Sequence, residues 1–306
     1  MKNEVEIHYE IGNEGKKGIP VVFVNGSIFN FKQWYSAYIP AFKKLTSDSI
    51  TYVLYDYQGI GLSSFKTDKF SMVQLVDELK QILDLLKFDK VHLFGASKGT
   101  MVSQAFAGTY PERVASLSGY GVVNLLSKPE ELSETKQEFV DRLEALKPYE
   151  PYFNKRMDKK LFGSIMKDVY TPVMFFKEFK NLNLKERIIF KLASRKVWPM
   201  MDQSPIGTMA LLFDYYINDL IKERPFYDQI IPNLKNIPKI LWLNGSNDKT
   251  TPLPLVEKLV SILPNSSLII FEGYSHIEPA LSKKMAGNIM ESYISFLSMR
   301  LLKYGS

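Results

Sequence analysis

The segment from 91 to 99 constrains the fold of this chain more than any other stretch of its sequence. Val91-His92-Leu93-Phe94 is typical of a buried strand, and it runs directly into Gly95-Ala96-Ser97-Lys98-Gly99, a Gly-x-Ser-x-Gly motif. Apolar residues at helical spacing follow between positions 100 and 107. Glycines on both sides of the serine allow the strand and the following helix to pack closely around a tight turn. The pattern therefore predicts that Ser97 lies between the carboxyl end of a buried strand and the N-terminus of a helix.

Strands alternate with helices on both sides of this segment. Continuous apolar runs such as 19–24 are typical of strands that are buried on both faces of a parallel sheet. The expected strands cover 5–9, 19–24, 50–55, 91–94, 114–120, 240–243 and 268–271, and the expected helices cover 31–45, 71–86, 253–263 and 280–302. This alternation predicts an α/β fold with a mostly parallel, doubly wound sheet that helices cover on both faces.

The middle of the chain, residues 124–235, has a different character. It is typical of helical pieces interrupted by prolines, and it is rich in phenylalanine, tyrosine and methionine. Because this segment separates two expected strands, we expect a helical cap, or lid, over the carboxyl ends of the strands. The chain then divides into a core made of 1–123 and 236–306 and a cap insertion made of 124–235.

The composition excludes several kinds of chemistry. The chain has no cysteine, which rules out disulfides, thiolate metal sites and a cysteine nucleophile. Gly59-Ile60-Gly61 lacks the third glycine of a dinucleotide-binding loop, and no pattern indicates a metal site, so we expect no cofactor and no metal. The net charge of +6 is explained by solubility alone or by an acidic partner or anionic substrate. Basic residues form no dense stripe, so we expect no nucleic-acid partner.

The hydropathy pattern bears on the location of the protein. The first residues are polar and lack the apolar region of a signal peptide. No apolar run reaches the length of a membrane span. We therefore expect a cytoplasmic protein.

A serine hydroxyl needs a base before it becomes a useful nucleophile, and the chain offers three histidines. His8 and His92 are expected on strands, where a structural role suits them better. His276 follows the last expected strand, so its loop lies at the carboxyl edge of the sheet. Asp248 follows the strand before that and is our candidate for orienting the imidazole, although a turn or helix-capping role is the alternative. The chain order of Ser97, Asp248 and His276 is that of the hydrolase version of this triad.

An acyl-transfer site also needs hydrogen-bond donors aimed at the developing oxyanion. We expect one from the backbone N–H of Lys98, which begins the helix after the nucleophile, and one from the loop after strand 19–24, where Ser27 is our candidate. The side chain of Lys98 is unusual, because a cation at a helix N-terminus opposes the helix dipole. It either reaches solvent or a carboxylate of the cap, or it recognises an anionic group of the substrate.

The chain resembles an α/β-hydrolase-fold enzyme over nearly its whole length. The residues that carry the resemblance are Asn25-Gly26-Ser27, the run 56–63, the Ser97 motif, Asp248 with Pro252, and the run 273–276. The resemblance implies a serine hydrolase that cleaves carboxylic esters or thioesters of apolar acyl groups, with Ser97, His276 and Asp248 as its catalytic residues. The stretch 23–27 is also similar to bacterial hydroxyacyl transacylases that use acyl-carrier-protein thioesters.

The resemblance leaves the acceptor and the substrate open. The leading alternative is an acyltransferase that uses acyl-carrier-protein or coenzyme A thioesters. The expected partner of this protein is a small-molecule acyl substrate, and the alternative adds an acidic acyl carrier protein. A ligand-binding protein without catalysis is a further alternative. As substrate-binding residues we expect Asn25, which stands where the family usually has histidine, and the cap aromatics Phe175, Phe176 and Trp198.

Overall fold

The computed structural model describes residues 6–64, 70–127, 131, 133–172, 178–220 and 222–298 of the chain. Its centre is a seven-stranded sheet in the order β1-β3-β2-β4-β5-β6-β7. Only β1 runs antiparallel, against β3, and the remaining neighbours are parallel. The strands are β1 (Tyr9–Gly12), β2 (Val21–Val24), β3 (Tyr52–Tyr55), β4 (Val91–Ala96), β5 (Val114–Tyr120), β6 (Ile240–Gly245) and β7 (Ser266–Phe271). The predicted fold class is confirmed.

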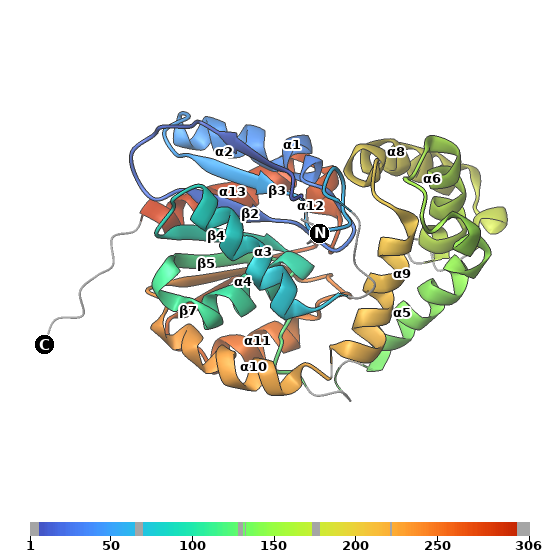
Figure 1. Ribbon diagram of the computed structural model, residues 1–306. Helices are drawn as coiled ribbons and strands as arrows, with labels where there is room; N and C mark the ends of the chain where they lie inside the picture. The colour runs from blue at the N-terminus through green and yellow to red at the C-terminus, as the bar shows by residue number, and fades with distance from the viewer. Residues whose placement is uncertain are drawn as a thin grey trace, which may run out of the picture.

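Helices cover both faces of this sheet (Figure 1). Consecutive residues of β4 point to opposite faces, so Leu93 and Phe94 belong to different apolar clusters. The cluster around Phe94 contains residues of α1 (Lys32–Ser36), α2 (Tyr38–Thr46) and α13 (Lys283–Ser298). The cluster around Leu93 contains residues of α3 (Met72–Leu85), α4 (Lys98–Thr109) and α11 (Leu253–Ser261). A short helix, η1 (Pro111–Arg113), precedes β5, and α12 (Glu278–Leu281) precedes α13.

A helical segment separates β5 from β6. Its elements are α5 (Ser133–Leu146), η3 (Lys147–Tyr152), α6 (Lys159–Ile165), η4 (Met166–Tyr170), η5 (Phe179–Asn181), α8 (Leu184–Met201), α9 (Ile206–Asp214), η6 (Tyr215–Asp219), α10 (Arg224–Ile230) and η7 (Ile231–Asn236). In Figure 1 the helices α5, α6, α8 and α9 lie together at one side of the sheet; we call α5 to η6 the cap. The later elements return to the core, where the Asn233 amide donates to the Gly108 carbonyl of α4 at 2.8 Å.

Polar contacts join the cap to the start of α1 and to two loops that follow strands of the sheet. Lys32 pairs with Asp202 at 2.9 Å, and the Asn30 amide donates to the same Asp202 at 3.1 Å. The backbone N–H of Gly61 donates to the Ser204 hydroxyl at 3.0 Å. We call these five residues the seam. They fasten the end of α8 and the residues after it to the core.

None of the helices in the described ranges has the length and apolar character needed to cross a membrane.

Candidate active site

The backbone of Ser97 has an unusual conformation. The residue lies between β4 and α4 with φ 51° and ψ −118°, a backbone conformation that residues other than glycine rarely adopt. A Cβ atom on Gly99 would lie 1.9 Å from the carbonyl oxygen of Val24 in β2, so only glycine lets α4 approach the sheet this closely. The packing of strand and helix therefore holds Ser97 in its strained turn.

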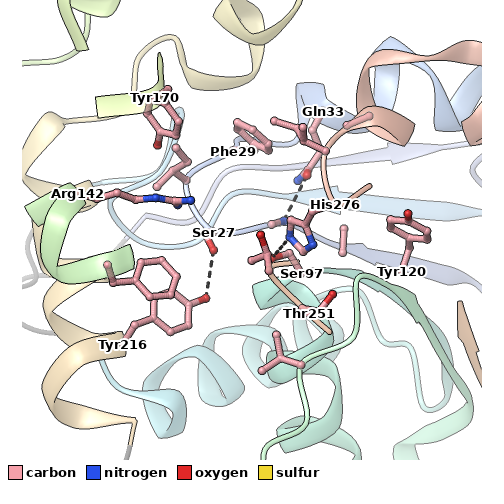
Figure 2. A pocket seen from close by; sticks show the side chains of 18 of the residues that line it. Ser27, Phe29, Gln33, Ser97, Tyr120, Arg142, Tyr170, Tyr216, Thr251 and His276 are labelled. Atoms are coloured by element: carbon pink, nitrogen blue, oxygen red, sulfur yellow. Dashed lines mark hydrogen bonds between the residues drawn. The ribbon is translucent and has the colours of Figure 1, made fainter. Parts of the chain in front are cut away.

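Ser97, His276 and Asp248 form one hydrogen-bonded chain. Figure 2 shows Ser97 beside His276 at the pocket wall. The Ser97 hydroxyl lies 2.8 Å from His276 Nε2, and His276 Nδ1 lies 2.8 Å from Asp248 Oδ2. The three residues follow β4, β7 and β6, whose carboxyl ends meet at one edge of the parallel sheet. The structure thus brings together the three residues that sequence reasoning selected. In contrast, His92 lies within β4 and contacts Ser116 at 2.8 Å.

Asp248 is held as an ionised acceptor. Its Oδ1 accepts from the backbone N–H groups of Thr250 and Thr251 at 3.0 and 2.8 Å, and its Oδ2 accepts from the Thr251 hydroxyl at 2.7 Å. Burial by itself would raise the pKa of Asp248, but the neighbouring His276 and the hydrogen bonds from Thr251 hold that pKa below its ordinary value. A buried carboxylate of this kind fixes the tautomer of the imidazole and stabilises the imidazolium.

Two residues that position His276 were missed by sequence reasoning. Gly121 follows β5 with φ 66°, and a Cβ atom there would lie 2.8 Å from His276 Cε1. The Tyr120 hydroxyl donates to the Ser275 carbonyl at 2.8 Å and ties down the loop that carries His276. A glycine directly after an expected strand was the available signal for a close approach of this kind.

A mostly apolar cavity of about 240 Å³ opens at Ser97 and His276. Both the core and the cap line it. Core residues include Ser27, Phe29, Val122 and Leu255. The cap residues are Lys136, Phe139, Arg142, Met166, Tyr170, Ala193, Val197, Met201, Phe213 and Tyr216, and Leu220 follows the cap. Sequence reasoning identified none of these cap residues, because the pattern of a helix does not show which neighbour its face will meet.

The two expected donors of an oxyanion hole lie near the nucleophile. Ser27 lines the cavity, and its hydroxyl lies 3.1 Å from the Tyr216 hydroxyl of the cap. Lys98 is the first residue of α4, so its backbone N–H has no acceptor within the helix. The neighbouring N–H of Gly26 is already used, since it donates to the Gln33 side chain at 3.3 Å.

The expected role of Asn25 in substrate binding is corrected. Its side chain is fully buried and is not among the residues that line the cavity. Its amide donates to the Tyr55 carbonyl at 2.6 Å, and its oxygen accepts from the Trp34 indole at 2.7 Å. Asn25 therefore holds the loop that carries Ser27 rather than a ligand.

The expected aromatic residues of the cap do not line the cavity either, as far as the structure describes them. Trp198 packs edge-on against Phe162 inside the cap, with ring centroids 5.1 Å apart, and it is not among the lining residues. Phe175 and Phe176 lie outside the described residues.

Both expectations for the Lys98 side chain are corrected. It is 1% exposed and reaches neither solvent nor the cavity. Its ammonium lies 3.8 Å from the centre of the Tyr57 ring, and no residue in the described ranges accepts a hydrogen bond from it. Burial lowers the pKa of Lys98 to about 7, against the opposing effect of the Glu78 carboxylate. Burial also raises the pKa of Glu78 to about 7. The turn at Ser97 directs Lys98 into the core beneath the nucleophile.

A metal site is not visible in the parts of the chain that the structure describes, where His, Asp and Glu residues form no group of three or more able to hold an ion.

Known proteins with similar sequences and structures agree with this fold. Residues 19–278 match the family model described as alpha/beta hydrolase fold. The chain is 24% identical over 285 residues to 2-hydroxy-6-oxononadienedioate/2-hydroxy-6-oxononatrienedioate hydrolase 1 of Pseudomonas putida, covering 89% of this chain and 86% of that one. Over 110 residues it is 36% identical to the dihydrolipoyllysine-residue acetyltransferase component of an acetoin cleaving system from the same organism, and this match spans only 28% of that protein.

Among solved structures, a thermophilic esterase from Thermogutta terrifontis (malate bound) superposes with a TM-score of 0.66 at 18% identity, covering 97% of this chain and 96% of that one. The family model, the sheet order and the turn at Ser97 lead to the same conclusion. The chain belongs to the α/β-hydrolase fold family.

Proposed function

We propose that the protein is a serine hydrolase that cleaves carboxylic esters or thioesters of apolar acyl groups. The observation that carries this proposal is the hydrogen-bonded chain of Ser97, His276 and Asp248 at the wall of an apolar cavity. Hydrolytic relatives such as the Pseudomonas putida dioate hydrolase support the reaction class.

In the first half of the reaction, Ser97 Oγ attacks the carbonyl carbon while His276 Nε2 takes the hydroxyl proton. The backbone N–H groups of Lys98 and Ser27 stabilise the negative charge that develops on the carbonyl oxygen. Asp248 stabilises the imidazolium, and its hydrogen bonds from Thr251 keep it ionised for this task. His276 then gives the proton to the departing alkoxide or thiolate, which leaves an acyl group on Ser97.

In the second half, water replaces the leaving group. His276 Nε2 removes a proton from the water, whose oxygen attacks the acyl carbon. The tetrahedral intermediate collapses, Ser97 Oγ recovers the proton, and the carboxylic acid is released. Acyl transfer to another acceptor would use the same residues. The Lys98 side chain, for which one expected role was to recognise an anionic group of the substrate, is buried in the core and gives that alternative no support.

The nucleophile is tested by labelling with a fluorophosphonate probe. We expect the probe to modify Ser97 alone, and Ser97→Ala to abolish labelling with little change in melting temperature. Ser261→Ala is the matched control, because Ser261 is exposed on α11 and should leave labelling intact. Full labelling of Ser97→Ala would contradict the assignment.

The reaction class is tested with p-nitrophenyl esters and acyl-CoA thioesters, with products read by mass spectrometry. Free acid as the product supports hydrolysis, whereas an acylated acceptor supports transfer. Absence of turnover on every substrate would support a binding protein without catalysis.

A further inference from the structure

One hydroxyl group of the cap contacts the loop that carries Ser27. Tyr216, the second residue of η6, has its hydroxyl oxygen 3.1 Å from the Ser27 hydroxyl oxygen. Figure 2 shows this contact in the wall of the pocket, with Tyr216 on one side of Ser27 and Ser97 on the other. Within the described ranges the Ser27 side chain makes no other hydrogen bond. The cap therefore supplies the polar contact that orients this side chain.

The ring of Tyr216 is held firmly in place. It stacks on the Phe139 ring of α5, with centroids 4.4 Å apart and planes 10° from parallel. Only 9% of Tyr216 is exposed. A tyrosine fixed in this way holds its hydroxyl at one position, because its side chain has only two rotatable torsions before the rigid ring.

The segment that carries Tyr216 is also fastened to the core. The hydroxyl of Tyr215, the preceding residue, donates to the Glu223 carboxylate at 2.6 Å. The same carboxylate accepts from the Ser71 hydroxyl at 3.0 Å and from the backbone N–H of Met72, the first residue of α3, at 3.1 Å. The position of Tyr216 is therefore set by the core as well as by the cap.

The backbone around Ser27 leaves one N–H group available. The two residues before it are tied to the core, since the Asn25 amide donates to Tyr55 and the Gly26 N–H donates to Gln33. In contrast, the backbone N–H of Ser27 has no acceptor among the residues that the structure describes. Either hydroxyl of the Tyr216 contact can be the donor, and in both cases the contact restrains the oxygen of Ser27.

We infer that Tyr216 is a positioning residue of the oxyanion hole. By holding the Ser27 hydroxyl, it keeps the Ser27 N–H directed at the carbonyl oxygen that becomes negative when Ser97 attacks. The inference rests on the proposed function, because this charge develops only in acyl transfer. Donors that are already in position need no reorganisation when the charge appears. Loss of the Tyr216 hydroxyl therefore weakens stabilisation of the transition state more than binding of a neutral ligand.

The first test is Tyr216→Phe, which removes the hydroxyl and keeps the ring that stacks on Phe139. We expect kcat/KM for p-nitrophenyl hexanoate to fall by about 3- to 10-fold, the effect of losing one neutral hydrogen bond. Tyr152→Phe is the matched control, because Tyr152 is an exposed cap tyrosine outside the cavity wall. Equal kcat/KM for the wild type and Tyr216→Phe would overturn the inference.

The second test separates positioning from packing. Ser97 adds to pentyl trifluoromethyl ketone to form a hemiketal whose oxygen is negatively charged, whereas methyl pentyl ketone binds as the neutral carbonyl. We expect Tyr216→Phe to raise the inhibition constant of the trifluoromethyl ketone by about 3- to 10-fold and to leave that of the methyl ketone nearly unchanged. An equal rise for both ketones would assign Tyr216 a packing role instead.

A double-mutant cycle tests whether Tyr216 acts through Ser27. Ser27→Ala breaks the same contact from the other side and keeps the backbone N–H. The two single variants and the double variant should therefore lose kcat/KM to about the same extent. Losses that multiply in the double variant would show that Tyr216 acts without Ser27 and would contradict the inference.

The two ketones also separate failure of this inference from failure of the proposed function. If no ester is hydrolysed but tight binding of the trifluoromethyl ketone depends on Tyr216, the positioning role stands and the hydrolase proposal fails. If esters are hydrolysed and Tyr216→Phe behaves as wild type, the hydrolase proposal stands and the positioning role fails. If the wild type neither hydrolyses esters nor prefers the trifluoromethyl ketone, both fail.

Discussion

Asn25 shows how one buried side chain supports the site without touching a ligand. Its amide and oxygen connect the end of β3 with the Trp34 indole of α1, and its own carbonyl accepts from the Tyr57 hydroxyl at 2.7 Å. The loop between β2 and α1, which carries Ser27, is therefore fixed from within the core. A position that sequence comparison would assign to substrate binding serves here to hold the backbone.

We expect Asn25→Ala to lower the free energy of unfolding by about 1–3 kcal/mol, because the Trp34 indole N–H loses its acceptor inside the core. Urea titration followed by fluorescence measures the change. Asn218→Ala is the control, since Asn218 is exposed on η6 and its amide donates to Asp214 at the end of α9. Equal stability of both variants would argue against the role of Asn25.

How far the sequence predicts the position of a side chain differs between residues, and the reasons are physical. Ser97, Asp248 and His276 each follow a strand, and parallel strands bring their carboxyl ends to one edge, so chain order and turn chemistry were enough to predict that these side chains meet. Arg142 could not be predicted in this way, because its position depends on how α5 packs against η4, α9 and η6. Lys98 shows a third case, in which the motif determines the backbone turn but not whether the next side chain points to the cavity or into the core.

At the scale of elements, two short turns of wider π-helical geometry shape the cavity. They are η4 (Met166–Tyr170) and η6 (Tyr215–Asp219), which supply Met166, Tyr170 and Tyr216 to its wall. Such turns hold an extra residue and are frequent at functional sites. The helix α8 contributes the small residue Ala193 to the same wall.

The length of the acyl pocket is tested at Ala193. In the wild type we expect kcat/KM to rise from acetyl to hexanoyl p-nitrophenyl esters by about 2- to 4-fold per methylene, as each buried methylene stabilises binding by about 0.8 kcal/mol. Ala193→Leu fills part of the cavity and should abolish the gain for the longer esters while sparing acetyl. Leu192→Ala, at an exposed neighbouring position of α8, should behave as wild type. A strict preference of the wild type for acetyl esters would contradict an apolar acyl pocket.

At the scale of the whole molecule, the buried Lys98 makes folding stability depend on pH. The lysine has an ordinary pKa of 10.5, whereas burial lowers its pKa to about 7 in the folded protein. Between these values the unfolded chain binds one proton more than the folded protein, so stability rises with pH across this window. Glu78 acts at lower pH, because its pKa is raised to about 7 in the folded protein. Below that pH the folded protein binds the extra proton, so the contribution of Glu78 to stability falls as the pH rises.

We therefore expect the free energy of unfolding to increase between about pH 7 and about pH 9.5, by up to about 3 kcal/mol from Lys98. Lys98→Met should lack this increase, and the difference between the two proteins isolates the lysine from other titrating groups. Lys191→Met removes an exposed lysine of α8 and should keep the wild-type profile. Parallel pH profiles for the wild type and Lys98→Met, measured by urea denaturation, would show that the buried ammonium has no such effect.

The seam fastens the α8 end of the cap to the core. Lys32, Asn30 and Gly61 hold the end of α8, and Figure 1 shows α8 beside α1 while α5 lies at the other end of the cap. At the α5 end, Glu131 pairs with Lys258 of α11 at 2.6 Å, so opening of the cap at either end breaks an ion pair.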